Sequence, residues 1–577
     1  MMDKKEVWEM EELLCPQKMQ NAGNTIIVSK NSTSTSQPPV GGSTKRENIK
    51  EETDVIGELV GGFGKWQFLM TILLSLFQIP NTFHISSTIY QAAEKDFWCE
   101  RPSHLKHVPV DVWRNISDSR DNCFQAKINW DEISLKDADV KNNNIPSPSF
   151  SSAIDGDDGR IPCTSWEFDR NDNIGNNWIS EWHLVCESEY LKSVAEMFFL
   201  VGVATGGILS GYLSDKFGRK TLLFISTFLQ TICAIALYFV TTFELYLALR
   251  TFLGFVSVSV TYAALILAIE YVDGDWKTIA GMYNLFPLPI SYTMISGIAY
   301  LTQDFQRLQL CISIPGIFLL LLWFVVPESP RWLLVKGRTE DVKKIVEATA
   351  KFNNKILPND YENKLKPPPG TMQNGIEVTA SFMSLFRVKY LRRITLCFLS
   401  IWFIMNLVYY GIILNMSTFG GNVYLNTALA GLVEIPAIAI AMFIILKVGK
   451  KWLFFSTLIC AGLACLCATL TEGDNNYLWL KITFVMIGKF TISAGNTIMP
   501  VYTAELYPTA IRNAGVGACN VAAGVALIST PYLSLLNKID VHFMMACLAI
   551  ASLLGGIVVV FLPETSKGQH KEEIEPK

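Results

Sequence analysis

Long apolar segments alternate with short polar stretches along most of this chain, and their lengths predict helices that cross a membrane. A membrane-spanning helix needs about 20 mainly apolar residues. Twelve segments meet this requirement, near residues 66–92, 193–213, 221–241, 245–271, 277–301, 308–326, 394–415, 424–446, 452–470, 478–500, 512–536 and 541–562. The pattern predicts an all-α integral membrane protein, and an even number of spans places both termini on the same side.

The polar stretches divide the spans into two sets of six. The expected parts are a cytoplasmic tail (1–64), an N-terminal six-helix bundle (65–326) with a long loop (94–189), a cytoplasmic linker (327–393), a C-terminal six-helix bundle (394–562) and a cytoplasmic tail (563–577). The first tail is expected to be largely disordered, because it is polar. Residues 339–352 of the linker have acids first and lysines after, which predicts a helix. We expect a helical bundle against the membrane here, and a flexible tether is the alternative.

Charge close to the spans predicts which side each connection occupies. Residues 327–393 carry 13 Lys/Arg against 7 Asp/Glu, whereas residues 94–189 carry 10 Lys/Arg against 19 Asp/Glu. Basic segments near spans stay in the cytoplasm. The linker and both termini are therefore expected in the cytoplasm and the long loop outside the cell.

The cysteines agree with an outer loop. Four of the 13 cysteines lie in that loop: Cys99, Cys123, Cys163 and Cys186. In an oxidising compartment they predict two disulfides, with three pairings open. Asn115 begins a glycosylation sequon in the same loop. The sequons at Asn31 and Asn415 are expected to be unused, because the first is cytoplasmic and the second adjoins the membrane.

Composition excludes several classes of function. Half of the residues are apolar and 17% are charged, against about 25% in soluble domains, and the mean hydropathy is +0.29. A net charge of −4 gives no reason to expect a nucleic-acid partner. There is no metal-ligand spacing, nucleophile elbow or phosphate loop, so neither an enzyme nor a bound cofactor or metal is expected. Composition makes the lipid bilayer the expected partner.

Two features repeat between the halves. The segment Gly211-Tyr-Leu-Ser-Asp-Lys-Phe-Gly-Arg-Lys220 follows the second span, and a weaker Lys447-Val-Gly-Lys-Lys451 follows the eighth. We expect the first segment to be a turn, with Gly211 and Gly218 allowing close helix approach and a left-handed conformation. Pro327-Glu-Ser-Pro330 follows the sixth span and Pro563-Glu-Thr565 follows the twelfth.

These motifs carry a resemblance to a known family. The first segment resembles the loop between helices two and three of major facilitator transporters. The ordered set Pro327–Leu334, Val433–Pro436, Ala504–Thr509 with Arg512-Asn513, and Pro563–Thr565, together with the Cys-bearing loop, resembles the organic cation, anion and zwitterion (carnitine-type) branch of that superfamily over about 57–566. The resemblance implies two pseudosymmetric bundles, a multi-pass plasma-membrane location and transport of small organic cations or zwitterions by alternating access. Organic anion transport, sugar transport and a transporter-like nutrient sensor are the alternatives.

The resemblance also implies a set of gating residues at the cytoplasmic face. In the first half these are Asp215, Gly218, Arg219, Glu270, Glu328 and Arg331. Their counterparts in the second half are Lys489, Glu505 and Arg512. Ion pairs that form in one state and break in another bias alternating access.

Ionisable and aromatic residues inside the spans are the substrate-binding candidates. A buried charge at that depth is costly and is therefore a functional candidate by default, and aromatic faces bind ammonium groups. Glu434 and Glu196 lie in matching spans of the two halves, and helical spacing places Trp402 and Tyr409 on one face. The family also has a cavity tyrosine at the position of Tyr409. The full set is Tyr409, Glu434, Glu196, Trp402, Tyr262, Tyr410, Asn496 and Gly524.

Three positions depart from the cation-carrying members of the family. Gly524 stands where they have an Asp, Val258 where they have a Lys, and Met405 where some have an acid. Because the usual charge selector is absent, we expect a zwitterion, a weakly charged amine or an uncharged solute, with Glu196 compensating in the first cases. The sequence leaves open whether Na⁺ or H⁺ is coupled.

Overall fold

The twelve apolar segments form helices in a computed structural model of the chain, which describes residues 55–564 apart from 94, 118–121, 127–159, 170–174, 275, 359, 366–383, 446–448, 472–476, 508–510, 537–539 and 541. A helix satisfies every backbone hydrogen bond within itself, which a lipid environment requires. Within this described part, twelve helical segments are long and apolar enough to span a membrane. Their bounds agree with the predicted ones to within a few residues, except that the second span begins earlier.

The N-terminal half contains the first six spans. Its first span is built of three consecutive helices and its fifth of two, and the remaining spans are single helices, some ending in a 3₁₀ turn. The elements are α4 (Lys65–Ser75), α5 (Gln78–Ser86), α6 (Thr88–Gln91), α10 (Tyr190–Phe217), α11 (Arg219–Ala236), η4 (Leu237–Phe239), α12 (Phe243–Glu270), α13 (Trp276–Tyr283), α14 (Pro287–Thr302), α15 (Phe305–Leu320) and η5 (Leu321–Phe324).

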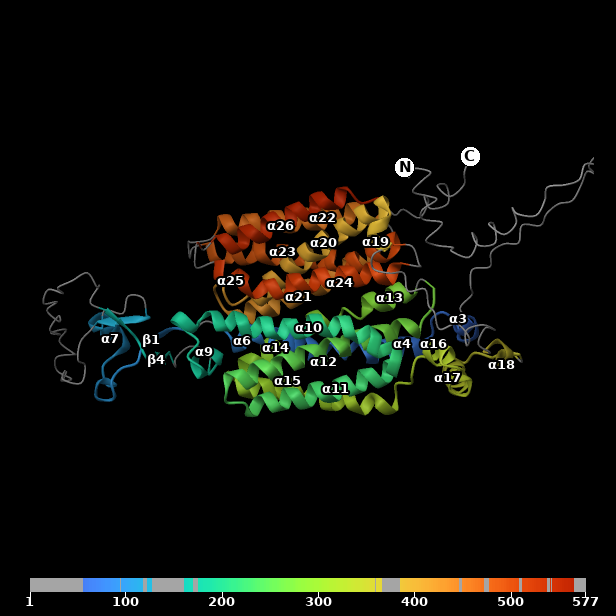
Figure 1. Ribbon diagram of the computed structural model, residues 1–577, viewed down its shortest axis with the longest axis horizontal. Coiled ribbons are helices and arrows are strands. Elements are labelled where there is room, and N and C mark those ends of the chain that lie inside the picture. The colour runs from blue at the N-terminus through green and yellow to red at the C-terminus, as the bar shows by residue number, and fades with distance from the viewer. Residues whose placement is uncertain are drawn as a thin grey trace, which may run out of the picture.

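The C-terminal half contains the other six. Its elements are α20 (Lys389–Leu414), α21 (Val423–Ile445), α22 (Lys450–Leu470), α23 (Leu478–Leu506), α24 (Arg512–Ser529), η7 (Thr530–Tyr532), α25 (Leu533–Leu536) and α26 (Phe543–Val560). The two halves lie one above the other in Figure 1, with α10, α14, α21 and α24 along the boundary between them. Large apolar side chains such as Ile208, Phe228 and Phe443 are exposed on the outer faces of the helices, as expected of surfaces that meet lipid.

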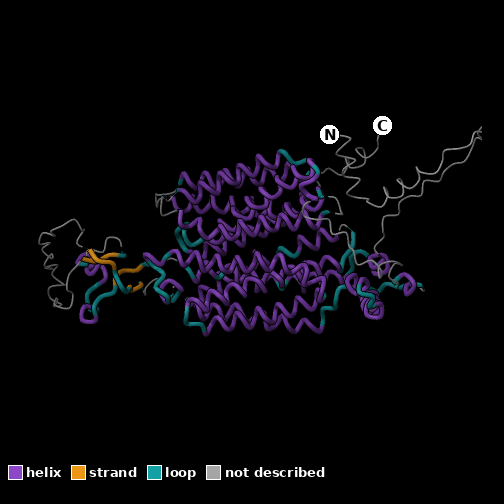
Figure 2. Tube along the Cα trace, viewed as in Figure 1, coloured by secondary structure: helices purple, strands orange, loops and turns teal. Residues whose placement is uncertain are grey.

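The two ends of this helical body differ. The loop between α6 and α10 extends from one end, which we call the loop end, and the linker helices α16 and α17 lie at the other, the linker end (Figure 1). The loop end carries short strands beside the helices (Figure 2): β1 (Phe97–Cys99) pairs antiparallel with β4 (Trp166–Phe168), and β2 (Phe124–Ala126) with β3 (Arg160–Pro162). Short helices accompany them: η1 (Ser103–Leu105), α7 (Val110–Ile116), α9 (Trp178–Glu181) and η3 (Cys186–Ser188).

The four loop cysteines form two disulfides. They join Cys99 to Cys163 and Cys123 to Cys186, which is one of the three pairings that the sequence left open. Asn115 is exposed on α7, so its glycosylation stays a prediction. Asn415 is buried and its side chain donates a hydrogen bond to the carbonyl oxygen of Gly411, while Asn31 lies outside the described residues.

Helices of the linker pack at the linker end of the N-terminal half. They are α16 (Pro330–Val335), α17 (Thr339–Phe352) and α18 (Tyr361–Lys364). The last linker helix, α19 (Ser384–Arg387), instead packs against α20 of the C-terminal half. A further helix, α3 (Val55–Val60), buries Leu59 and Val60 against Val342 and Val346 of α17. The end of the predicted disordered tail is therefore helical and packed, because its apolar residues find a partner in the linker. Residues 1–54 and the proline-rich stretch 366–370 lie outside the described residues.

The expected turn at 211–220 is much shorter than the sequence suggested. Helix α10 continues through Phe217, and only Gly218 breaks it, with φ of +98°. A left-handed φ favours glycine because it has no Cβ. The expectation that Gly211 permits close helix approach is wrong, because a Cβ at that position would meet open space.

Candidate substrate site and charge network

A buried ion pair occupies the middle of the C-terminal half. Glu434 is the central residue of α21, and Lys489 lies on α23. Their side-chain Oε2 and Nζ atoms are 3.0 Å apart, and the two side chains are 3% and 0% exposed. Two opposite charges taken out of water together are tolerated because each offsets the other, whereas either one alone would be strongly destabilising.

Tyrosines surround this pair. Tyr409 of α20 donates a hydrogen bond to Glu434 Oε1 at 2.7 Å, and the Lys489 ammonium lies 3.5 Å from the centre of the Tyr409 ring. Tyr292 of α14, which belongs to the other half, lies 5.5 Å from the same ammonium. An ammonium over an aromatic face is attracted by the ring quadrupole. The pair is thus enclosed by residues from both halves of the molecule.

The structure places the remaining substrate candidates at different distances from this cluster. Tyr410 packs edge-on to Tyr409 with ring centres 5.0 Å apart, and it interacts electrostatically with Tyr262 of the opposite half. Asn496 lies two helical turns beyond Lys489 on α23. Trp402 lies about two turns from Tyr409 on α20, toward the linker end, where its indole N–H donates to Thr503 Oγ1 at 3.0 Å.

Two candidates do not join the cluster. Glu196 lies near the start of α10, toward the loop end, where it interacts with Lys192 and Arg250 rather than facing Glu434. Gly524 lies where α24 approaches α10, and a Cβ there would come 3.1 Å from that of Ala204. The missing side chain at 524 therefore allows close contact between the halves.

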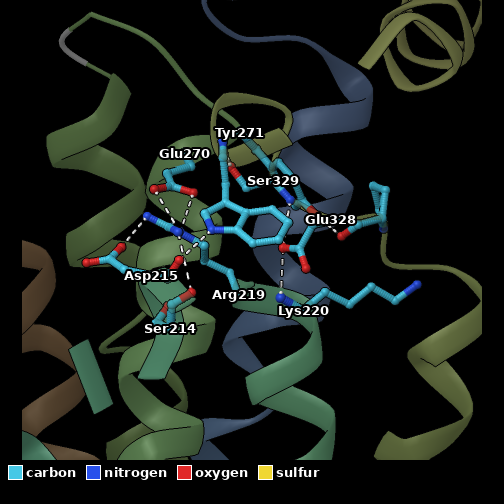
Figure 3. Close-up of polar contacts among 10 residues, drawn as sticks. Ser214, Asp215, Arg219, Lys220, Glu270, Tyr271, Glu328 and Ser329 are labelled. Atoms are coloured by element: carbon cyan, nitrogen blue, oxygen red, sulfur yellow. Dashed lines mark hydrogen bonds and ion pairs between the residues drawn. The ribbon is translucent and has the colours of Figure 1, made fainter. Parts of the chain in front are cut away.

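A second polar network lies at the linker end of the N-terminal half (Figure 3). Arg219 is its centre: the guanidinium is 2.8 Å from Asp215 and 3.1 Å from Glu270. The Arg219 and Glu270 side chains are 12% and 17% exposed, whereas that of Asp215 is 73% exposed. The Arg219–Glu270 pair is therefore the shielded one. Trp332 of α16 adds a hydrogen bond from its indole N–H to the Asp215 carbonyl oxygen at 2.9 Å.

Glu328 holds the beginning of α11. Its Oε1 accepts hydrogen bonds from the backbone N–H groups of Lys220 and Ser329, both at 2.9 Å. The first N–H groups of a helix lack partners within it, and a carboxylate there also complements the helix dipole. Gly218 leaves room for this carboxylate, since a Cβ at 218 would lie 2.5 Å from Glu328 Oε2.

Arg331 contacts Asp273, a residue that the sequence analysis missed. It lies 3.6 Å from Asp273 and donates a hydrogen bond to the Val272 carbonyl oxygen at 2.7 Å. Burial disfavours the charged form of Asp273, but hydrogen bonds from Lys277 and Gly274 and the charge of Arg331 outweigh it and hold the pKa of Asp273 below its usual value. A pocket lined in part by Glu270, Asp273 and Arg331 adjoins this network, beneath α3 and α17.

The second half repeats much of this arrangement. Glu564 Oε1 accepts from the backbone N–H of Lys451 at 3.4 Å, as Glu328 does from Lys220, and a Cβ at Gly449 would lie 2.6 Å from that oxygen. Tyr271 and Tyr502 each donate a 2.6 Å hydrogen bond to the carbonyl oxygen of a proline, Pro327 and Pro563 respectively. The internal repeat is thus visible in individual hydrogen bonds.

The predicted second-half counterpart network is not assembled as expected. Glu505 pairs with Lys450, while Lys489 lies far inside the bundle with Glu434. Arg512 begins α24, and no described residue accepts a hydrogen bond from its buried Nε atom. The depth of Lys489, eleven residues into an apolar segment, is the signal that would have separated it from the linker-end residues.

The hydrogen bonds that join the two halves in the described part of the chain lie toward the loop end. The Ser193 hydroxyl donates to the Pro531 carbonyl oxygen at 3.1 Å. The Ser296 hydroxyl donates to the Tyr424 carbonyl oxygen, and the rings of Tyr90 and Tyr424 stack with centres 5.4 Å apart. The polar networks at the linker end instead lie within each half.

Two six-helix halves related by an internal repeat, with an ion pair and aromatic residues buried beside their boundary, define a membrane transporter of the major facilitator fold. Comparison with known proteins agrees. The sugar (and other) transporter family matches residues 155–577, and the chain belongs to this family, in its organic cation, anion and zwitterion (carnitine-type) branch. The relatives are membrane transporters, not enzymes.

Curated relatives match nearly the whole chain. An organic cation transporter protein of Drosophila melanogaster is 30% identical over 530 residues, covering 90% of this chain and 93% of the relative. The human organic cation/carnitine transporter 2 is 28% identical, covering 89% and 91%. The xylose transporter XylE of E. coli, in a partially occluded inward-open conformation, shares the fold, with a TM-score of 0.56 at 14% identity and coverage of 87% and 98%.

Proposed function

We propose that this protein carries small organic cations or zwitterions, such as amines and carnitine-like solutes, across the plasma membrane by alternating access. The observation that carries the proposal is the buried Tyr409–Glu434–Lys489 cluster, which Tyr292 completes from the other half. A site shared by both halves near the middle of the bilayer is where transporters of this architecture bind their solutes.

The charges of the cluster favour a zwitterion within that class. Glu434 and Lys489 together carry no net charge, and each is the other's ionic partner. A cation that binds Glu434 leaves Lys489 without its partner, whereas a zwitterion offers an ammonium to the carboxylate and a carboxylate to the ammonium. The tyrosine faces add a surface that attracts the ammonium of either solute. Tyr262, Tyr410 and Asn496 are the proposed flanking contacts.

We further propose that the loop end faces outside the cell and that the linker and both termini are cytoplasmic. The basic linker and the acidic, disulfide-bearing loop support this orientation. The hydrogen bonds between the halves then seal the outer side, so the structure corresponds to an inward-facing state. Opening outward requires these hydrogen bonds to break and the linker ends of the two halves to approach each other. This movement would bring the Arg219 network close to the Lys450–Glu505 pair.

A transport assay tests the proposal. Uptake into proteoliposomes is measured for a quaternary ammonium ion, carnitine, an organic dicarboxylate and a hexose, with and without Na⁺, at two pH values and at clamped potential. We expect saturable uptake of the first two and none of the hexose. Tyr409→Phe should raise KM for them by about tenfold, because it removes the 2.7 Å hydrogen bond to Glu434.

Phe398→Leu is the matched control, since Phe398 is buried in the same helix away from the cluster. Flux of the dicarboxylate alone would assign the site to anions, with Lys489 as the binding charge. Flux of the hexose alone would make the protein a sugar carrier. Absence of flux for all four, in protein that still binds one of them, would support a nutrient sensor.

A further inference from the structure

Near the loop end of the N-terminal half, a guanidinium lies buried without an acceptor. Arg250 of α12 is 0% exposed. None of its three nitrogen atoms finds a hydrogen-bond acceptor among the described residues. Instead the guanidinium carbon lies 4.6 Å from the centre of the Phe199 ring and 5.5 Å from that of Trp178. Aromatic faces attract the cation, but they do not replace hydrogen-bond acceptors for its five N–H groups.

The neighbours of Arg250 add further donors. The indole Nε1 of Trp178 and the hydroxyl of Tyr246 are both buried without a hydrogen-bond partner among the described residues. The two rings pack against each other with centres 5.0 Å apart, and Tyr246 interacts electrostatically with Arg250. His84 of α5 also lies within electrostatic range of Arg250, and its Nδ1, which donates or accepts according to the tautomer, has no hydrogen-bond partner among the described residues. Buried polar groups are almost always hydrogen-bonded, so several together indicate a shared partner.

Glu196 is the acid that could neutralise Arg250, but it does not form an ion pair with it. Glu196 interacts electrostatically first with Lys192 and then with Arg250, but among the described residues no ion pair within 4 Å joins Glu196 to Arg250. The first span contributes no acid, because 65–91 contains neither Asp nor Glu. The cluster therefore contains several unpaired donors, and among the described residues no carboxylate is in direct contact with the Arg250 guanidinium.

We propose that this cluster is a binding site for a small monovalent inorganic anion, chloride under physiological conditions. A chloride ion accepts hydrogen bonds from guanidinium, indole and hydroxyl donors and neutralises Arg250. It would tie the loop helix α9, through Trp178, to α10 and α12, and so hold the loop onto the outer end of the N-terminal half. The site is separate from the transported solute and does not depend on its identity.

The test uses the full chain, purified in detergent. Its thermal unfolding midpoint and its binding of ³⁶Cl⁻ are measured as sodium chloride replaces sodium gluconate at constant ionic strength and pH. Chloride should raise the midpoint saturably, as expected for a ligand that binds only the folded state, with one ion bound per chain. Bromide should substitute and give an anomalous scattering peak within hydrogen-bond distance of Arg250.

Variants locate the site. Tyr246→Phe removes one donor and keeps the ring, and it should raise the half-saturating chloride concentration at least threefold. Tyr507→Phe, which removes a buried hydroxyl in the other half, should leave it unchanged. Glu196→Gln should preserve or tighten chloride binding, because it removes a competing negative charge.

Three results would overturn the proposal. The first is an identical midpoint in chloride and gluconate with no bound ³⁶Cl⁻. The second is chloride binding that Tyr246→Phe leaves unchanged, which would place the ion elsewhere. The third is an unfolding midpoint that chloride does not change in the parent protein but raises in the Glu196→Gln variant. This result would identify the Glu196 carboxylate as the partner of Arg250.

Discussion

Replacing Lys489 with Met tests the central cluster most directly. The substitution keeps an unbranched side chain of similar length and removes the charge, so Glu434 is left buried and unpaired. We expect the variant to be less stable than the parent and to shift its preference from zwitterions toward cations. The physical reason is that a bound ammonium can take the position of the missing Lys489 charge, whereas the carboxylate of a zwitterion no longer has a cation to meet.

The size of the effect follows from the geometry. Charges 3.0 Å apart attract by about 5.5 kcal/mol at an effective dielectric constant of about 20. Breaking a buried pair by removing one partner destabilises proteins by about 3–5 kcal/mol. A fraction of this recovered on binding a cation, about 1.4 kcal/mol, corresponds to a tenfold gain in affinity. We therefore expect the ratio of cation to zwitterion affinity to rise at least tenfold.

Two measurements check this reasoning. Thermal shifts with a quaternary ammonium ion and with carnitine report binding, and competition uptake reports transport selectivity. Lys481→Met is the control, because Lys481 is a buried lysine on the same helix, two turns away from the cluster. In the double variant Glu434→Gln/Lys489→Met, stability should partly return and the gained cation preference should vanish. An equal loss of affinity for both ligands in Lys489→Met, with no recovery in the double variant, would refute the interpretation.

Further predictions concern the linker end and the loop. Glu270→Gln should lower the maximal transport rate several-fold with little change in substrate preference. Asp215→Asn should lower it less, because the Asp215–Arg219 pair is exposed. Transport rates normalised to surface protein test this, and equal effects or a changed substrate preference would contradict it. Gly218→Ala should lower the thermal unfolding midpoint more than Gly449→Ala, because both crowd a glutamate but only Gly218 has a positive φ. Cys99→Ser and Cys163→Ser should each lower the stability as much as the double variant Cys99→Ser/Cys163→Ser, because all three break the same disulfide. Cys99→Ser/Cys123→Ser should lower the stability further, because it breaks both disulfides. If its effect did not exceed that of either single variant, the observed pairing would be contradicted.

The spans and the family were predictable from the sequence because both depend on local signals. A run of about 20 apolar residues is recognised from consecutive positions alone. The motifs around Gly218 and Glu328 are equally local, because they lie in the short connections directly next to the spans. The partners of Glu328 show this clearly. A carboxylate directly after the sixth span, and a glycine directly before the third, bring an acid to a helix N-terminus that needs an acceptor.

Side-chain partners inside the bundle were not predictable in the same way. Lys489 and Glu434 are 55 residues apart in the sequence, and nothing local indicates which faces of α21 and α23 meet. Assigning Lys489 to the linker-end gate followed its place beside Glu505 in the motif order and overlooked its depth. Tyr292 was missed for the same reason, because it contributes from the opposite half and acquires a role only when the halves pack together.

The buried charges of the two halves differ in their arrangement. An acid on the second helix and a base on the fourth helix of each half give Glu196 with Arg250 and Glu434 with Lys489. In the C-terminal half these side chains meet as an ion pair beside a tyrosine of the opposite half, so a charged solute and the movement of the halves can both disturb it. In the N-terminal half the base instead lies between aromatic rings toward the loop end, without an ion pair to its acid. Glu196 lies 22 residues before Gly218, whereas Glu434 lies 15 residues before Gly449, so the repeat does not place the two acids at equivalent depths. We infer that the C-terminal pair is placed to recognise the solute, while the N-terminal cation is placed to hold the loop end together.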